Sequence, residues 1–187
     1  MNYEIERKFL IEYPDLSQLR ARAARVIGIE QTYLSGTGGG VSRRVRKSTE
    51  NGAVTYMKNE KRRISAARRE ENESEISREE YLELIRSADP ARRTIIKTRY
   101  CVPVNGLTAE VDVFSGMTEF AVCEVELPSE DAPFALPDFL TVIREVTDDP
   151  RFTNAAMSVI CSTFLSLAIS SNLLISSGAF PRRFLNA

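Results

Sequence analysis

The feature that most constrains this chain is an alternation of charged and apolar residues. At the N-terminus, Glu4, Glu6 and Lys8 alternate with apolar residues such as Ile5. Successive side chains of a strand point to opposite faces, so this alternation predicts a strand with one apolar and one charged face. Taken alone, such a strand is typical of a sheet edge or surface, with its charges in water.

The same alternation returns far along the sequence, in three other strand-like segments. Their charged positions are Glu110 and Asp112, Glu124 and Glu126, and Lys97 and Arg99. If such strands close into a barrel, the charged faces would line its interior. Charges buried without partners are costly, so they would have to pair with each other, with water or with a charged ligand.

The rest of the chain indicates a mixture of strands and a few helices. Asn51-Gly52 and Asn105-Gly106 predict tight hairpins. Apolar spacing and capping residues predict helices over about 15–26, after Ser77, and over 134–140. About eight strands without βαβ alternation indicate a single α+β domain with an antiparallel sheet.

Composition limits the chemistry that is available. The chain has no histidine, which removes the commonest general base and leaves carboxylates, lysine or metal-bound water. Its three cysteines are widely separated, which is unlike a zinc site or a disulfide framework and fits a reducing cytoplasm. With 25 basic and 26 acidic residues, the net charge of -1 gives no reason to expect a nucleic-acid partner.

A C-terminal tail over 157–187 differs from the rest. No charged residue occurs from Phe152 to Phe180, and the segment is apolar but rich in serine. Its length would cross a bilayer core of about 30 Å, so a tail anchor over 157–180 is one interpretation. The other is a helix packed on the domain or a poorly ordered tail, which the serines favour.

Beyond the alternation, the chain resembles a known family through several motifs that occur in the family's order. The first, Glu4-Ile5-Glu6-Arg7-Lys8, is similar to an ExExK signature. The others are Arg44-Val45-Arg46, Tyr56-Met57-Lys58, 69–73, Lys97-Thr98-Arg99, 110–114, 124–127 and 148–154. Together they resemble the CYTH superfamily, the triphosphate tunnel metalloenzymes. The resemblance implies an antiparallel eight-stranded closed β-barrel with flanking helices over 1–156.

The resemblance also implies roles for individual residues. Carboxylates are hard donors suited to Mg²⁺ or Mn²⁺, and arginine and lysine neutralise phosphoryl oxygens. The implied metal ligands are Glu4, Glu6, Asp112, Glu124 and Glu126. The implied phosphate-binding residues are Lys8, Arg44, Arg46, Lys58, Arg69, Lys97 and Arg99. Lys8, Arg46, Lys58 and Glu73 are the implied catalytic residues, with Glu71 and Glu110 in supporting positions.

The function that these residues imply is hydrolysis of inorganic tripolyphosphate to pyrophosphate and phosphate. Thiamine triphosphatase and adenylyl cyclase activities, which also occur in the family, stay open, although the sequence contains no recognisable motif for reading a base. An alternative of another class is a non-catalytic polyphosphate-binding module, in which the paired carboxylates would have no purpose without metal. The expected partner is a small-molecule triphosphate, and a homodimer stays open.

Overall fold

The structure is a computed structural model that describes residues 5–36, 41–63, 69–129 and 131–159. Side chains are described for the same residues except 62, 63 and 69–71. Most of the predicted apolar tail therefore lies outside the described residues. Within the described part of the chain, no helix is long and apolar enough to cross a membrane.

Nine strands form one antiparallel sheet, in the order β5-β4-β3-β2-β6-β7-β8-β1-β9. The strands are β1 (Ile5–Glu12), β2 (Arg25–Tyr33), β3 (Val41–Glu50), β4 (Ala53–Arg63), β5 (Arg69–Glu75), β6 (Ile95–Val104), β7 (Leu107–Phe114), β8 (Phe120–Leu127) and β9 (Val142–Glu145). With the helices, this arrangement confirms the α+β class.

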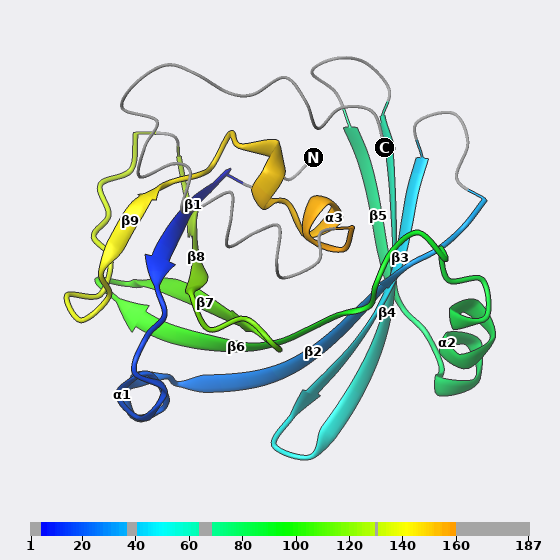
Figure 1. The fold of residues 1–187 in the computed structure, drawn as a ribbon, viewed down its shortest axis with the longest axis horizontal. Coiled ribbons are helices and arrows are strands. Elements are labelled where there is room, and N and C mark those ends of the chain that lie inside the picture. Colours follow the sequence, from blue (N-terminus) through cyan, green and yellow to red (C-terminus); the bar gives the residue numbers. More distant parts are fainter. Residues whose placement is uncertain (1–4, 37–40, 64–68, 130, 160–187) are drawn as a thin grey trace.

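The sheet is strongly curved but open, so the predicted closed eight-stranded barrel is wrong. A ninth strand is present, and the outer strands β5 and β9 each pair with only one described neighbour. Figure 1 shows the two arms of the sheet facing each other across a concave side, where η1 (Pro150–Phe152) and α3 (Asn154–Met157) lie. Hairpins specify which neighbours pair, but closure would require β5 and β9 to meet.

Both predicted hairpins are confirmed. Asn51 and Gly52 have φ values of 49° and 83°, and Asn105 and Gly106 have values of 49° and 80°. A two-residue turn with positive φ at both positions matches the right-handed twist of its strands, and asparagine and glycine adopt that conformation most readily. These turns fix the register of β3 with β4 and of β6 with β7.

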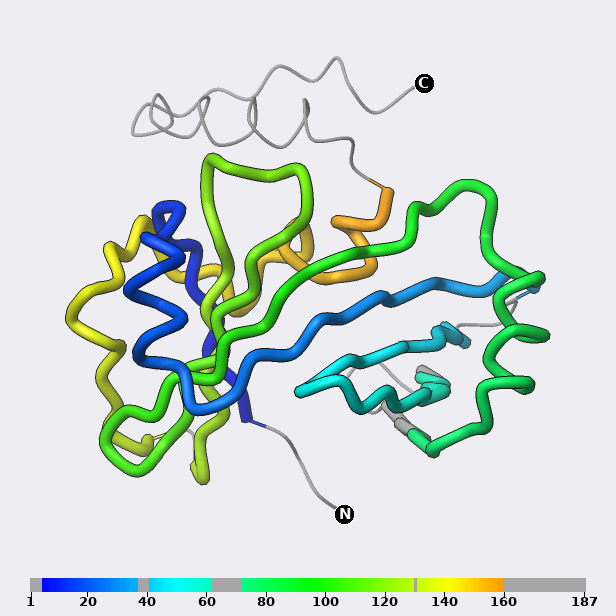
Figure 2. The backbone as a smooth tube through the Cα atoms, turned by 90° about the horizontal axis from the view of Figure 1, so that it is seen from below, coloured from blue at the N-terminus to red at the C-terminus, as the bar shows by residue number. Residues whose placement is uncertain are grey.

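The two longer helices, α1 (Leu16–Arg22) and α2 (Arg78–Ile85), lie outside the curve of the sheet (Figure 1). Helix α1 is shorter than predicted, since β2 already begins at Arg25, and α2 follows the predicted cap at Ser77. Figures 1 and 2 place these two helices at opposite ends of the sheet. The helix predicted over 134–140 does not form. Pro137 interrupts that segment, and proline lacks the amide donor that a helix interior needs.

Apolar residues of the alternating strands pack together on the opposite side from the charged ones. One cluster includes Ile11, Val111 and Val125, all fully buried, and a smaller one joins Val45 to Tyr81 of α2. Burying such a side chain contributes about 1.5–3 kcal/mol. This packing turns the charged positions of the same strands toward the concave side of the sheet.

Candidate active site

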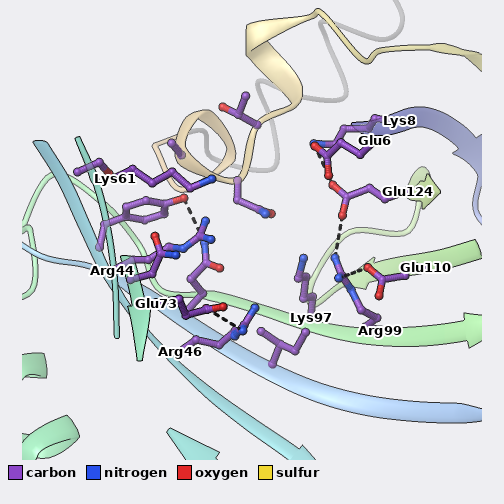
Figure 3. A pocket seen from close by; sticks show the side chains of 18 of the residues that line it. Glu6, Lys8, Arg44, Arg46, Lys61, Glu73, Lys97, Arg99, Glu110 and Glu124 are labelled. Carbon is purple, nitrogen blue, oxygen red and sulfur yellow. Dashed lines mark hydrogen bonds and ion pairs between the residues drawn. The ribbon is translucent and has the colours of Figure 1, made fainter. Parts of the chain in front are cut away.

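A cavity of about 620 Å³ occupies the concave side of the sheet and is shown in Figure 3. Each of the strands β1 to β8 contributes residues to the cavity, and Thr153, Asn154 and Ala155 complete its lining. Its charged lining consists of Glu6, Lys8, Arg44, Arg46, Lys61, Glu73, Lys97, Arg99, Glu110, Glu124 and Glu126. Most of the residues predicted for the site therefore meet at one place.

Strand register explains why residues distant in sequence converge. Residues directly opposite each other on paired strands share a face of the sheet. Glu124 of β8 lies opposite both Lys8 of β1 and Glu110 of β7, and Glu6 lies opposite Glu126. We call Glu6, Glu110, Glu124 and Glu126 the carboxylate wall.

Lys8 is embedded in the carboxylate wall. Its Nζ lies 2.9 Å from Oε1 of Glu124 and 3.4 Å from Oε1 of Glu6. Burial alone would lower the pKa of Lys8, but the two carboxylates outweigh it and raise the pKa above its usual value. The ammonium group is therefore a cation held between two carboxylates.

Next to this wall lies a buried ion-pair cluster of Lys97, Arg99 and Asp112. Nε of Arg99 donates to Oδ1 of Asp112 at 2.7 Å, and Lys97 pairs with Oδ2 of the same carboxylate. Arg99 Nη2 also reaches Oε2 of Glu124 at 2.8 Å, which joins the cluster to the wall. Burial lowers the pKa of Lys97, whereas Lys97 and Arg99 overcome burial to hold the pKa of Asp112 below its usual range.

The placement of Asp112 does not match the predicted metal ligand. Its side chain is 1% exposed and does not line the cavity. Both of its oxygens already accept hydrogen bonds from Lys97 and Arg99. Its position suits it to orient those two cations, which do face the cavity.

A second group of charges, which we call the cation wall, consists of Arg44, Arg46 and Lys61 on β3 and β4. Figure 3 shows it across the cavity from Glu6 and Glu124, with Glu73 beside it. Arg46 Nη2 donates to Oε1 of Glu73 at 2.9 Å. Arg46 Nε is buried and has no hydrogen-bond acceptor among the described residues. An orphaned buried donor of this kind calls for an acceptor from a ligand.

Lys58 was predicted to bind phosphate, and the structure places it elsewhere. Its Nζ pairs with Oε1 of Glu80 in α2 at 2.8 Å, and it does not line the cavity. In the register of β3 with β4, Lys58 lies opposite the buried Val45, whereas Arg44 lies opposite Asn59. Asn59 and Lys61, which sequence reasoning missed, occupy the cavity face instead.

Three other predicted residues cannot be placed as side chains. Glu4 lies outside the described residues, and of Arg69 and Glu71 only the backbone in β5 is described. Sequence reasoning also missed Gln31 and Tyr33, two buried residues of β2 that line the cavity and are joined by a 3.1 Å hydrogen bond. They carry no charge, so the charged alternation gave no signal for them.

The chain is similar to known proteins over most of its length. The family model described as "CYTH domain" matches residues 2–152. An inorganic triphosphatase of Nitrosomonas europaea is 33% identical over 83% of this chain and 97% of its own length. One of Acetivibrio thermocellus is 47% identical over 33% of this chain and 38% of its own length. The solved structure of the inorganic triphosphatase NE1496 superposes with a TM-score of 0.58 at 29% identity, covering 86% of this chain and 97% of the other. This chain belongs to the CYTH domain family.

Proposed function

We propose that the protein hydrolyses the terminal phosphoanhydride bond of a short linear triphosphate, with inorganic tripolyphosphate as the preferred substrate and a divalent cation as cofactor. The observation that carries this proposal is the pairing of a carboxylate wall with a cation wall across one cavity. A polyphosphate chain with a bound metal ion complements both walls, because its oxygens suit the cations and its metal suits the carboxylates. The relatives named inorganic triphosphatase favour the same substrate.

The carboxylate wall fits Mg²⁺ or Mn²⁺ in the chemistry of its donors. Among the described residues, no three carboxylates are gathered closely enough to hold an ion by themselves. Mg²⁺ does not require such a cage, since it is usually bound by one or two carboxylates together with water and substrate phosphates. Glu6 and Glu124 already hold a cation, the ammonium of Lys8, between them. We assign the ion to one or two of the carboxylates Glu6, Glu124 and Glu126, with Glu4 as a further ligand, and water and substrate phosphate oxygens would complete its coordination.

The cations act on the phosphate chain. Arg44, Arg46 and Lys61 neutralise its oxygens, and Glu73 orients Arg46 through their ion pair. Lys8, Lys97 and Arg99 stabilise the charge that develops as the bridging P–O bond breaks. A water oxygen bonds to the terminal phosphorus, pyrophosphate leaves, and the proton of the water is released with the phosphate. A bound metal ion would supply further charge neutralisation at the phosphoryl oxygens.

Phosphate release from tripolyphosphate in the presence of Mg²⁺ or Mn²⁺ tests the proposal. We expect turnover in the wild type, its loss after chelation, and a large loss in Lys8→Ala. A matched control is Lys47→Ala on β3, because Lys47 pairs with Glu30 and does not line the cavity. Full activity in Lys8→Ala, or an equal loss in both variants, would contradict the proposed site.

A substrate panel separates the alternatives. Tripolyphosphate, ATP and thiamine triphosphate are incubated in parallel, and both phosphate and cyclic AMP are measured. We expect the highest kcat/KM for tripolyphosphate and no cyclic AMP. Metal-dependent binding of tripolyphosphate without turnover would instead indicate a non-catalytic binding module.

A further inference from the structure

One rim of the cavity is formed by a segment that belongs to no strand. Asn154 and Ala155 of α3 and its N-cap Thr153 line the cavity, while the rest of the lining comes from the sheet. Figures 1 and 3 show α3 lying between the two arms of the open sheet, beside the cavity. The position of α3 therefore limits the space that is open to a substrate.

Helix α3 cannot hold this position by its own stability. It has four residues, and isolated helices shorter than about 12 residues are marginal in water. At its N-terminal side, Phe152 is 3% exposed and packs edge-on against Phe120, with ring centroids 6.4 Å apart. Contacts at the C-terminal side must then fix its direction.

Those contacts come from the loop between α2 and β6, through the side chain of Arg92 and through the backbone N–H of Arg93, which donates to the carbonyl oxygen of Ser158 at 2.8 Å. Arg92 Nη1 donates to the carbonyl oxygen of Ala155 at 2.7 Å and to Oγ of Ser158 at 3.1 Å. Its guanidinium lies over the ring of Tyr33, 5.0 Å from the centroid, and its Nε donates to Asp89 at 3.2 Å. The carbonyls at a helix end lack partners within the helix, so an arginine that binds one of them fixes that end.

We propose that Arg92 is a positioning residue for substrate selection. By holding α3 across the cavity, it keeps the space suited to a compact inorganic triphosphate and excludes triphosphates that carry a bulky organic group. This inference rests on the proposed function, and it adds a residue that does not itself line the cavity. Without the hydrogen bonds from Arg92 to Ala155 and Ser158, α3 shifts and the cavity opens to larger substrates.

The test compares tripolyphosphate with ATP in the full-length protein. In Arg92→Ala we expect the ratio of kcat/KM for ATP to kcat/KM for tripolyphosphate to rise by about tenfold, within the range that pocket shape contributes to selectivity. In Arg92→Lys, which can still donate to a carbonyl, we expect a smaller rise. Ser158→Ala, which removes one acceptor, should also shift the ratio in the same direction. If Arg92→Ala does not fold, the other two variants provide the result.

The matched control is Arg86→Ala. Arg86 forms an i,i+3 ion pair with Glu83, as Arg92 does with Asp89, but it is an exposed pair at the end of α2. In Arg86→Ala we expect the ratio of kcat/KM for ATP to kcat/KM for tripolyphosphate to stay at the wild-type value. A general loss of activity with an unchanged ratio in the Arg92 variants would show a merely structural role and overturn the inference.

Failure of the inference can be distinguished from failure of the proposed function. If the wild type hydrolyses tripolyphosphate but the Arg92 variants keep its selectivity, only the inference falls. If the wild type does not turn over tripolyphosphate, calorimetry can measure the affinities for tripolyphosphate and ATP. The ratio of these two affinities then replaces the ratio of kcat/KM values. An unchanged binding ratio in the Arg92 variants, or no binding of either compound, would overturn the inference as well.

Discussion

The two walls of the cavity are built by the same alternation of charged and apolar residues, yet they are held in different ways. Beside the carboxylate wall, Lys97 and Asp112 have side chains 3% and 1% exposed and are fixed by mutual ion pairs. On the cation wall, Arg46 is 30% exposed, and its Nε has no acceptor among the described residues. One side is thus ordered by protein contacts, and the other has binding capacity left for a ligand.

Because of this difference, we expect the buried ion pairs to contribute mainly to stability and the partly exposed cations mainly to substrate binding. Removing one partner of a buried ion pair leaves an uncompensated charge, which costs several kcal/mol. Removing a partly exposed cation costs little stability but removes an interaction with substrate. Substitutions of the two kinds of residue should therefore change different quantities, stability for the buried pairs and activity for the partly exposed cations.

We expect Asp112→Ala to lower the free energy of unfolding by about 3–5 kcal/mol, because it leaves Lys97 and Arg99 without their shared partner. Urea denaturation measures this loss. Glu110→Ala is the control: its side chain is 36% exposed and Arg99 keeps two other carboxylates, so the loss should stay below about 1 kcal/mol. Equal losses in the two variants would show that burial of the ion pair does not decide its contribution to stability.

We expect Arg46→Ala to lower kcat/KM for tripolyphosphate by a factor of about 100, which corresponds to roughly 2.7 kcal/mol, with little change in stability. Arg46 lines the cavity, and its buried Nε has no acceptor in the part of the chain that the structure describes. Lys58→Ala should leave kcat/KM nearly unchanged, because Lys58 pairs with Glu80 away from the cavity. A larger effect for Lys58 than for Arg46 would show that the opposite face of β4 binds substrate.

We expect Asp149→Asn to lower the free energy of unfolding by about 1 kcal/mol at neutral pH, because asparagine can still cap η1 but lacks the charge that pairs with Arg151 and Arg144. Hydrogen bonds from Arg151 hold the pKa of Asp149 well below its usual range. Its contribution is therefore present above the unfolded pKa of about 3.9 and is lost as the pH falls toward the folded pKa. The gap between wild type and variant should shrink below about pH 4.

Denaturation curves at several pH values measure this gap. The control is Asp138→Asn, because the side chain of Asp138 is 91% exposed and its ion pair with Arg22 is long, at 3.5 Å. A gap for Asp149→Asn that stays constant down to low pH would show that its charge plays no part in holding η1.

Sequence reasoning predicted much of the site because alternation fixes which residues share a face. Glu124, Lys8 and Arg99 converge as the pattern indicated. Lys58 was misplaced because its motif was considered alone. Counting outward from the Asn51-Gly52 turn sets Lys58 opposite Val45, on the face of the sheet away from the cavity, a signal that was available in the sequence.

Other features had no local signal. Closure of the barrel depends on whether β5 meets β9, two strands far apart in the sequence with no turn between them. The role of Arg92 depends on contacts with Ala155 and Ser158, more than 60 positions away. Such contacts follow from packing of the whole chain, so neither periodicity nor a short motif could predict them.

Because the sheet is open, its outer strands affect how readily the protein aggregates. An outer strand presents unpaired backbone groups that can recruit strands from other molecules and start aggregation. Strand β5 has the sequence REENESE, with five charged residues among seven. Four of the five are acidic, so two copies aligned side by side would repel each other. The same charges that make β5 a plausible neighbour for phosphate-binding cations thus also protect the protein from polymerising through that strand.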